Sequence, residues 1–323
     1  MKKAFAVSFY RFKKSRIPII LSIALLVVLA VSTGILLSRT GGGAPESAFT
    51  EEYREYLLHE KRQYEEELSD SDIENAERHD IEMALAKVEY FLETESTRGN
   101  YYNDTPGDGG AYWMQIYFLF GAFTSAIAAV IVTVWFYTGT KTGIHRTESL
   151  TGRSRSSLWL GKNGAAASVA FVTPLIFTII MFICALCSSD TRFLVEDDMT
   201  TRVYSVSVFA QWALQAVSLF AVTAVSSAIA SFVTTVSGDS AAGTSVSLLI
   251  LLITTLGTFV TFNAFKDIAP DNLTSTFIPY IGIILIPFRC GISNAFIIAL
   301  CAHIAIAVVL YLLSYMLYRR KTL

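Results

Sequence analysis

Charged residues are scarce over most of this chain. Asp, Glu, Lys and Arg make up 16% of its 323 residues, whereas an average soluble domain contains about 25%. Half of the charges, 7 basic and 19 acidic residues, lie between Arg39 and Asp108, and the remainder of the chain consists largely of long apolar runs. This distribution excludes a soluble globular enzyme, a disordered chain and a nucleic-acid-binding protein. It predicts an all-α polytopic membrane protein with one extramembrane insert.

The chain also lacks the motifs of several enzyme classes. It has no phosphate-binding loop, because Gly161-Lys162 is followed by Asn163 and lacks the upstream glycine, so the chain cannot hydrolyse ATP alone. A His-Glu-x-x-His motif is absent, and the apolar runs contain no carboxylate of the kind that a proton pump needs. We therefore expect no catalytic, cofactor-binding or metal-binding residue in this chain.

One histidine and a pair of cysteines are the remaining candidates for chemistry. His303 is the only ionisable side chain, apart from Tyr and Cys, within the apolar runs, and we expect it to be a structural hydrogen-bonding residue. Cys184 and Cys187 have no second pair or nearby His, so we expect packing rather than metal or redox chemistry. A membrane-embedded hydrolase around His303 is the alternative that this residue leaves open.

Six charge-free stretches are long enough to cross a bilayer, which takes about 20 residues. A seventh apolar run, Thr276–Phe288, is too short to span and is interrupted by two prolines and a glycine. The six predicted membrane spans are Ile17–Ser38, Tyr112–Tyr137, Ala165–Ser188, Val203–Val236, Thr244–Phe265 and Ile292–Tyr318.

Lysine and arginine are concentrated in alternate loops. The N-terminus, the loop between the second and third spans and the C-terminus are basic, whereas the insert is acidic. Because short cytoplasmic loops are enriched in Lys and Arg, we expect a multi-pass protein of the cell membrane with both termini in the cytoplasm and the insert outside. The predicted units are a cytoplasmic interfacial helix (1–16), one span (17–38), an extracytoplasmic acidic hairpin (39–111) and a five-span core (112–323) with a cytoplasmic loop (139–164) and a re-entrant segment (276–291).

Two extramembrane parts have helical periodicity. Phe5, Phe9 and Phe12 recur at helical spacing among Lys and Arg, which predicts an amphipathic helix on the cytoplasmic leaflet. The insert predicts two antiparallel helices, the first over Thr50–Leu68 and the second after a Ser-Asp turn with a capping box at Ser71 and Glu74.

The spans are rich in small residues, which allow close helix packing. Polar side chains also cluster within one turn of the fourth span. They line a pathway or bond a neighbouring helix, and the sequence leaves both readings open. These possible pathway residues are Gln211, Trp212 and Gln215.

The cytoplasmic loop supplies the most informative motif: a Gly start, a polar basic stretch, a Ser-Arg pair and an apolar stretch that ends in Gly-Lys. It resembles the coupling segment of type-2 ABC transporter permeases, the membrane subunits of the exporter class. Gly152 stands where that family often has Pro, and the stretch after Gly143 is more polar than usual. The residues expected to couple to the ATPase are Gly143, Arg146, Gly152, Arg153, Ser154, Arg155, Gly161 and Lys162.

The resemblance implies a permease dimer, formed with a second copy or a related permease, that works with separate ABC ATPase subunits. ATP and Mg²⁺ would bind to that partner, and no cofactor is expected in this chain. The coupling helix, Arg146–Leu158, would transmit closure of the ATPase dimer to the spans. The expected substrate is amphipathic, such as a lipid, an antimicrobial peptide or a drug, and membrane lipid is an expected partner. The alternative is a non-transporting membrane sensor or scaffold that binds a ligand through its outward hairpin.

Overall fold

The computed structural model describes residues 2–40, 49–69, 75–95, 109–137, 154–187, 208–264 and 294–320. Within these ranges the chain forms α-helices joined by turns, and they contain no strand. The predicted all-α class is therefore confirmed. The segment 276–291, expected to be re-entrant, lies outside the described residues.

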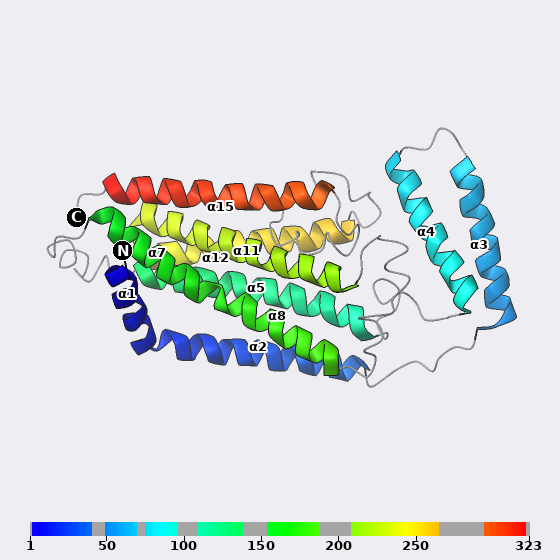
Figure 1. The fold of residues 1–323 in the computed structure, drawn as a ribbon, viewed down its shortest axis with the longest axis horizontal. Coiled ribbons are helices and arrows are strands. Elements are labelled where there is room, and N and C mark those ends of the chain that lie inside the picture. The colour runs from blue at the N-terminus through cyan, green and yellow to red at the C-terminus, as the bar shows by residue number, and fades with distance from the viewer. Residues whose placement is uncertain are drawn as a thin grey trace.

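Long apolar helices lie side by side in one bundle (Figure 1), and they follow the six predicted stretches. Their bounds are α2 Ile17–Thr40, α5 Gly109–Tyr137, α7 Arg155–Ala170 continued by α8 Val172–Cys187, α11 Val208–Ser237, α12 Ser240–Ala264 and α15 Asn294–Arg320.

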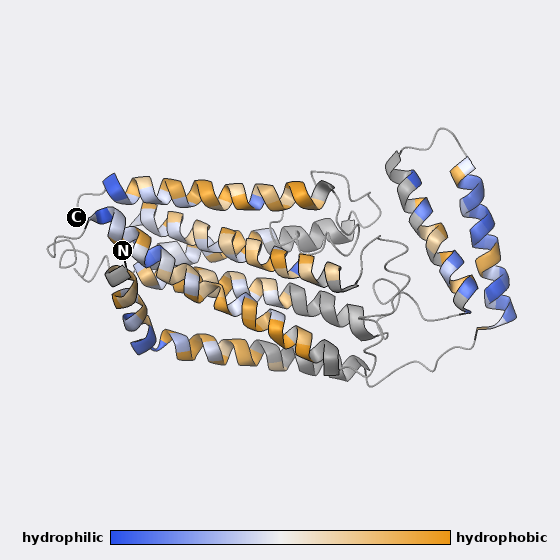
Figure 2. Cartoon of the chain, in the orientation of Figure 1, coloured by the Kyte–Doolittle hydropathy of each residue, from blue (hydrophilic) through white to orange (hydrophobic). Residues whose placement is uncertain are grey.

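Four of these helical segments are long and apolar enough to cross a membrane. Apolar residues predominate along the bundle in Figure 2. These features fit a membrane-embedded protein. The four segments are Phe120–Tyr137, Arg155–Ile180, Ala213–Ser237 and Phe296–Arg320; Ile17–Val27 and Ser240–Thr254 are shorter apolar helices.

Three helices of the bundle, α5, α11 and α15, run in the same direction. Thr133 bonds Ser227, and Tyr137 bonds Ser231, so α5 and α11 advance together by four residues per contact. Contacts of α11 with α15 also advance in the same direction along both helices. Those contacts are Ser227 with Tyr311 and Ser231 with Ser314.

Local sequence explains where two of the helices end. Pro174 has no N–H to donate to the carbonyl of Ala170, and the α7–α8 helix breaks at Phe171, one turn earlier. Gly238 adopts a left-handed φ of 66° after α11, and its N–H bonds the Thr234 carbonyl. Asp239 then accepts a bond from the Ala241 N–H and caps α12. The resulting turn is short, so α12 packs back against α11.

The acidic insert forms the two predicted helices, α3 Glu51–Ser69 and α4 Asn75–Thr94. Leu57 of α3 and Val88 and Phe91 of α4 form a separate small core. Lys61 bonds Glu89 across the pair at 2.7 Å. The capping box expected at Ser71 and Glu74 lies outside the described residues. The pair is hydrophilic on its outside and lies apart from the bundle in Figure 2.

The predicted N-terminal helix is also present, as α1 Lys2–Lys14. Ser15 ends it by donating to the Phe12 carbonyl at 2.7 Å, and α2 starts two residues later. In Figure 1 α1 lies across one end of the bundle rather than along it.

Candidate functional site

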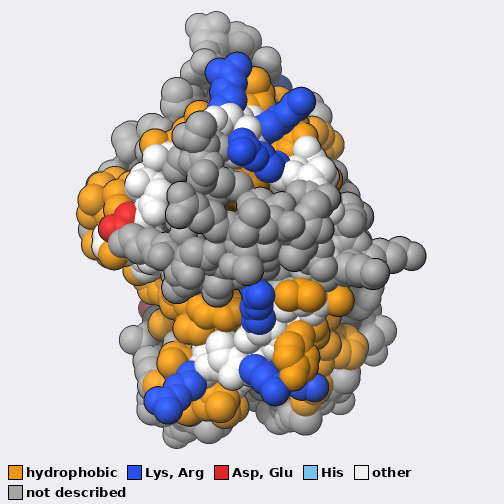
Figure 3. Space-filling view, turned by 90° about the vertical axis from the view of Figure 1, so that its left-hand side faces the viewer, with side chains coloured by type: hydrophobic (Ala, Val, Ile, Leu, Met, Phe, Trp, Pro, Cys, Tyr) orange, Lys and Arg blue, Asp and Glu red, His pale blue; other side chains and the backbone are white. Residues whose placement is uncertain are grey.

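One end of the bundle brings together α1, the last residues of α5 and α15, and the first residues of α7 (Figure 1). We call it the basic end, because Lys and Arg side chains are distributed over it in Figure 3. Among the described residues outside the hairpin ranges 49–69 and 75–95, Asp239 is the one acidic residue. The basic end is where the described part of the coupling segment lies.

The predicted coupling residues are divided between described and undescribed parts of the chain. Gly143, Arg146, Gly152 and Arg153 lie outside the described residues. Ser154 is the N-cap of α7, and its side chain accepts a bond from the Ser157 N–H. The remaining three residues, Arg155, Gly161 and Lys162, belong to α7 itself.

The helix that follows the coupling segment begins earlier than expected. The sequence predicted a loop to residue 164 and a span from Ala165, but the structure is helical from Arg155. The N-cap at Ser154 defines the start, and burial of Leu158 and Trp159 stabilises the first turns. Only the last residues of the predicted coupling helix Arg146–Leu158 are described, and they form the first turn of α7.

Arg155 and Ser156 join this start to the end of α15. The Arg155 guanidinium donates to the Arg319 carbonyl at 3.1 Å. The hydroxyls of Ser156 and Tyr315 are 2.8 Å apart. These two contacts attach the first turn of α7 to the end of α15.

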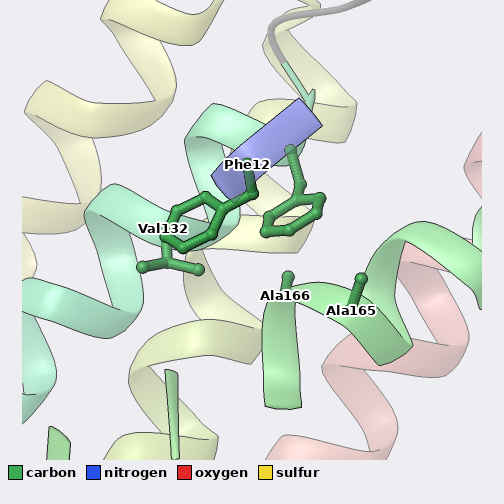
Figure 4. Packing of buried hydrophobic residues seen from close by; sticks show 5 residues of the cluster. Phe12, Val132, Ala165 and Ala166 are labelled. Atoms are coloured by element: carbon green, nitrogen blue, oxygen red, sulfur yellow. The ribbon is translucent and has the colours of Figure 1, made fainter. Parts of the chain in front are cut away.

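Gly161 is the position where α1 meets α7. A Cβ at Gly161 would lie 2.7 Å from the Ala4 Cβ and 3.0 Å from the Phe5 backbone nitrogen. One turn further along, Phe12 of α1 packs on Ala165 and Ala166 of α7 (Figure 4). Glycine and alanine on α7 thus allow α1 to lie directly against this helix.

Lys162 follows Gly161 and is buried, with 6% of its surface exposed. The positive charge of Arg11 on α1 acts on it. The Gly-Lys pair of the coupling motif is therefore part of the α1–α7 contact and not of an exposed loop.

Asn163 is one of three residues that form a closed ring of hydrogen bonds between three helices. Its amide nitrogen donates to the Tyr137 hydroxyl of α5 at 2.8 Å, and its amide oxygen accepts from the Ser231 hydroxyl of α11 at 3.2 Å. Tyr137 and Ser231 are 2.8 Å apart. Because Ser231 has one proton and gives it to Asn163, Tyr137 donates to Ser231. Each member both donates and accepts within the ring, which satisfies buried polar groups and fixes the helices relative to one another.

Further hydroxyls extend this ring to α15 and along α11. Ser314 lies 2.9 Å from Ser231 and 2.9 Å from Thr235. One turn earlier on α11, a second group joins the same three helices α5, α11 and α15: Tyr311 donates to Ser227 at 2.9 Å, and Ser227 lies 2.6 Å from Thr133. We call the whole set the polar network; its members are Thr133, Tyr137, Asn163, Ser227, Ser231, Thr235, Tyr311 and Ser314.

Sequence reasoning missed the polar network, although a signal was present. Ser227, Ser231 and Thr235 recur every four residues on α11, and Thr133 and Tyr137 do so on α5. Such spacing places polar side chains on one helix face inside an apolar run, which favours bonding between helices.

An aromatic cluster packs beside the network. Trp159 of α7 contacts Tyr315 and Tyr311 of α15 at ring-centroid distances of 5.2 and 6.4 Å. Tyr137 and Tyr318 belong to the same buried cluster. These rings add apolar contact area to the junction of α5, α7 and α15.

The predicted pathway residues lie on α11, far along the helix from the basic end. Gln215 is buried with 1% of its surface exposed, and its amide nitrogen has no hydrogen-bond partner. The side chains of Gln211 and Trp212 lie outside the described part. The structure therefore gives Gln215 an inward position but no contact that identifies a pathway.

His303 is buried within α15, and its Nδ1 lies 2.6 Å from the Ala299 carbonyl oxygen one turn earlier. A carbonyl accepts only, so Nδ1 carries the proton. This bond is internal to the helix. In the described ranges, no group of three or more His, Cys, Asp or Glu residues is placed to hold a metal ion.

The basic end combines exposed Lys and Arg side chains (Figure 3) with buried hydrogen bonds around α7, the helix that starts next to the predicted coupling segment. These bonds join α7 to α5, α11 and α15. No family model, curated protein or solved structure matches this chain.

Proposed function

We propose that the chain is the permease subunit of an ABC exporter, driven by a separate ATPase. The observation that carries the proposal is the attachment of α7: the helix that follows the coupling motif is bonded to α5, α11 and α15 through Asn163 and Arg155. A loop that receives force needs such an attachment, because otherwise its movement would be lost in local bending.

The proposed topology has six spans with both termini in the cytoplasm. The basic end is then the cytoplasmic face, which agrees with the positive-inside bias. The parallel direction of α5, α11 and α15 supports this count, since the second, fourth and sixth spans of a six-span protein run the same way. The segment 276–291 is proposed to enter and leave from the outside.

The proposed mechanism uses α7 as a lever. Closure of the ATPase dimer moves residues 143–153, and α7 carries that movement into the bundle at the level of the polar network. The rest of the proposed assembly consists of a second permease, ATP and Mg²⁺ on the ATPase, and an amphipathic substrate such as a lipid, an antimicrobial peptide or a drug. The hairpin α3–α4 lies at the other end and is assigned to substrate access.

The test is co-purification of the permease from its native membranes, with the partner identified by mass spectrometry as a chain that contains a phosphate-binding loop. Reversing the charge of Arg146 and Arg153 to Glu should remove the ATPase from the complex. The matched control reverses Arg54 and Arg62, two exposed residues of α3, and should leave it bound. Equal retention of the ATPase by both double variants would refute the coupling assignment.

The rival function is a membrane sensor or scaffold that binds its ligand through the hairpin. Its separate core of Leu57, Val88 and Phe91 favours an autonomous binding module. This function requires no ATPase, so a purified protein that lacks one and yet responds to a ligand through α3–α4 would support the rival.

A further inference from the structure

Helix α1 has one face that is packed against the protein and an opposite face that is exposed. Ala4, Ser8 and Phe12 recur every four residues and are buried, at 4%, 5% and 6% exposure. Phe12 enters the space between α5 and α7 (Figure 4). The sequence had assigned Phe5, Phe9 and Phe12 to one apolar face, but close approach at Gly161 makes Ala4, not Phe5, the packed residue.

The second face is aromatic and exposed. Phe5 and Phe9 are 36% and 43% exposed, and their rings stack with centroids 6.2 Å apart. Tyr10 is 57% exposed. Exposed aromatic side chains next to a bundle of apolar helices fit the boundary between acyl chains and headgroups.

Basic side chains lie on this exposed face too, because Lys13 follows Phe9 by one turn and Lys14 follows Tyr10 by one turn. Lys13 and Lys14 are exposed at the end of α1, and Arg16 is exposed just after it. The Lys14 ammonium lies 5.0 Å from the centroid of the Tyr10 ring, so aromatic and cationic groups adjoin. Neither α1 nor its flanking residues contain an acid.

We propose that α1 binds an anionic phospholipid leaflet through the aromatic and basic side chains of its exposed face, and that this binding holds its packed face on Gly161 of α7. Charge complementarity identifies the partner. A zwitterionic leaflet would accommodate only the aromatic side chains, whereas the lysines require negatively charged headgroups. The charge of the lipid would thereby determine the stability of the contact between α1 and α7, the helix that follows the predicted coupling segment. The regulatory consequence rests on the proposed function, but the lipid contact does not.

The size of the effect follows from the charges. Each Lys or Arg close to an anionic leaflet strengthens binding roughly fivefold, and the attraction falls off within a Debye length. Loss of two lysines should therefore weaken the attachment of α1 by roughly tenfold or more. High salt should weaken it in the same direction.

The experiment measures amide hydrogen exchange of residues 2–14 in the full-length protein, reconstituted in nanodiscs of phosphatidylcholine with or without phosphatidylglycerol. We expect exchange in α1 to slow by about tenfold when the anionic lipid is included. The double variant Lys13→Gln, Lys14→Gln, which leaves the packed face intact, should lose this slowing. The control Arg54→Gln, Arg62→Gln removes the same charge from α3 and should keep it.

Two further measurements distinguish a lipid leaflet from a free anion as the ligand, and distinguish failure of the lipid contact from failure of the exporter function. Inorganic phosphate added to phosphatidylcholine nanodiscs should not slow exchange, and if it does, a local anion site replaces the leaflet. Equal exchange in both lipids, or equal behaviour of the Lys13, Lys14 variant and wild type, would overturn the inference. If no ATPase associates while the lipid effect persists, the exporter function fails and the lipid contact stands.

Discussion

Between α5, α7, α11 and α15 the bundle buries an amide and several hydroxyls, whereas the hairpin α3–α4 buries Leu57, Val88 and Phe91 and leaves its charges in water. The members of the polar network in the bundle are neutral and hydrogen-bonded. Polar groups of the hairpin are ionised, as in the pair of Lys61 with Glu89, whose side chains are 30% and 44% exposed.

The difference follows from the surroundings of each region. Association of helices in lipid gains little from burying apolar side chains, because the lipid is equally apolar, so hydrogen bonds and close packing select the partner. In water the hairpin associates by removing Leu57 and its neighbours from solvent. Substitutions that remove hydrogen bonds should therefore matter most in the bundle, and those that remove apolar volume should matter most in the hairpin.

The largest effect is expected for Leu57→Ala. It removes the most buried side chain of the small hairpin core and should lower the free energy of unfolding of the α3–α4 pair by about 2–5 kcal/mol. Amide exchange of residues 51–69 in the full-length protein measures this. The control Leu58→Ala changes a neighbouring leucine that is 38% exposed and should have little effect. Unfolding of the bundle by Leu57→Ala would contradict the separation of the two regions.

A smaller loss is expected for Asn163→Leu. It removes one hydrogen bond from each of the buried Tyr137 and Ser231 hydroxyls, which costs about 1–3 kcal/mol. Thermal unfolding in detergent measures the change, and Ser168→Ala, at an exposed serine of the same helix, is the control. Adding Tyr137→Phe and Ser231→Ala should recover part of the loss, because the buried hydroxyls that had lost a hydrogen bond are removed. Strict additivity of the three changes would argue against a closed ring.

Gly161→Leu tests close packing at the basic end. The new side chain overlaps Ala4 and should displace α1 from α7, a cost of about 1–3 kcal/mol. Faster exchange of residues 2–14 is the expected readout. Gly164→Ala is the matched control, because a Cβ there would meet only the Phe5 ring, at 3.7 Å. If both variants behave alike, the Ala4–Gly161 contact does not hold α1.

The smallest effect concerns the charged pair of the hairpin. The hydrogen bond to Glu89 raises the pKa of Lys61 above its ordinary value. A raised pKa means that the contribution to stability is present at neutral pH and is lost as pH rises through the pKa of the folded state. The pair is partly exposed, so we expect only about 0.2–1 kcal/mol.

Spin labels on Glu52 of α3 and Glu93 of α4 measure the separation of the two helices as pH is raised. Burial also raises the pKa of Tyr64, so its ionisation loosens the hairpin at alkaline pH as well. The difference between wild type and Lys61→Gln isolates the Lys61 contribution. The same pH response in both proteins would show that the Lys61–Glu89 bond adds no stability.

Helix existence was predictable from the sequence, whereas the start of the third apolar helix was not. Uncharged runs of sufficient length fix α2, α5, α11, α12 and α15, since an apolar segment in lipid must satisfy its own backbone. The third helix starts at Arg155 rather than Ala165 because Ser154 caps it and α1, α5 and α15 cover its first turns. The charge pattern of the sequence predicted a loop for residues 155–164, because it contains no information about the helices that bury them.

The composition and the period of apolar residues determined the helical class, the six apolar stretches and the two helices of the insert, because these depend on local burial and length. Only the tertiary structure decided which polar residues meet. Asn163, Tyr137 and Ser231 come from three distant helices, and their ring depends on the parallel arrangement of α5 and α11 and on the position of α7 between its neighbours. Likewise, the sequence makes α1 amphipathic, but the absence of a Cβ at Gly161 decides that Ala4 faces the protein and Phe5 faces outward.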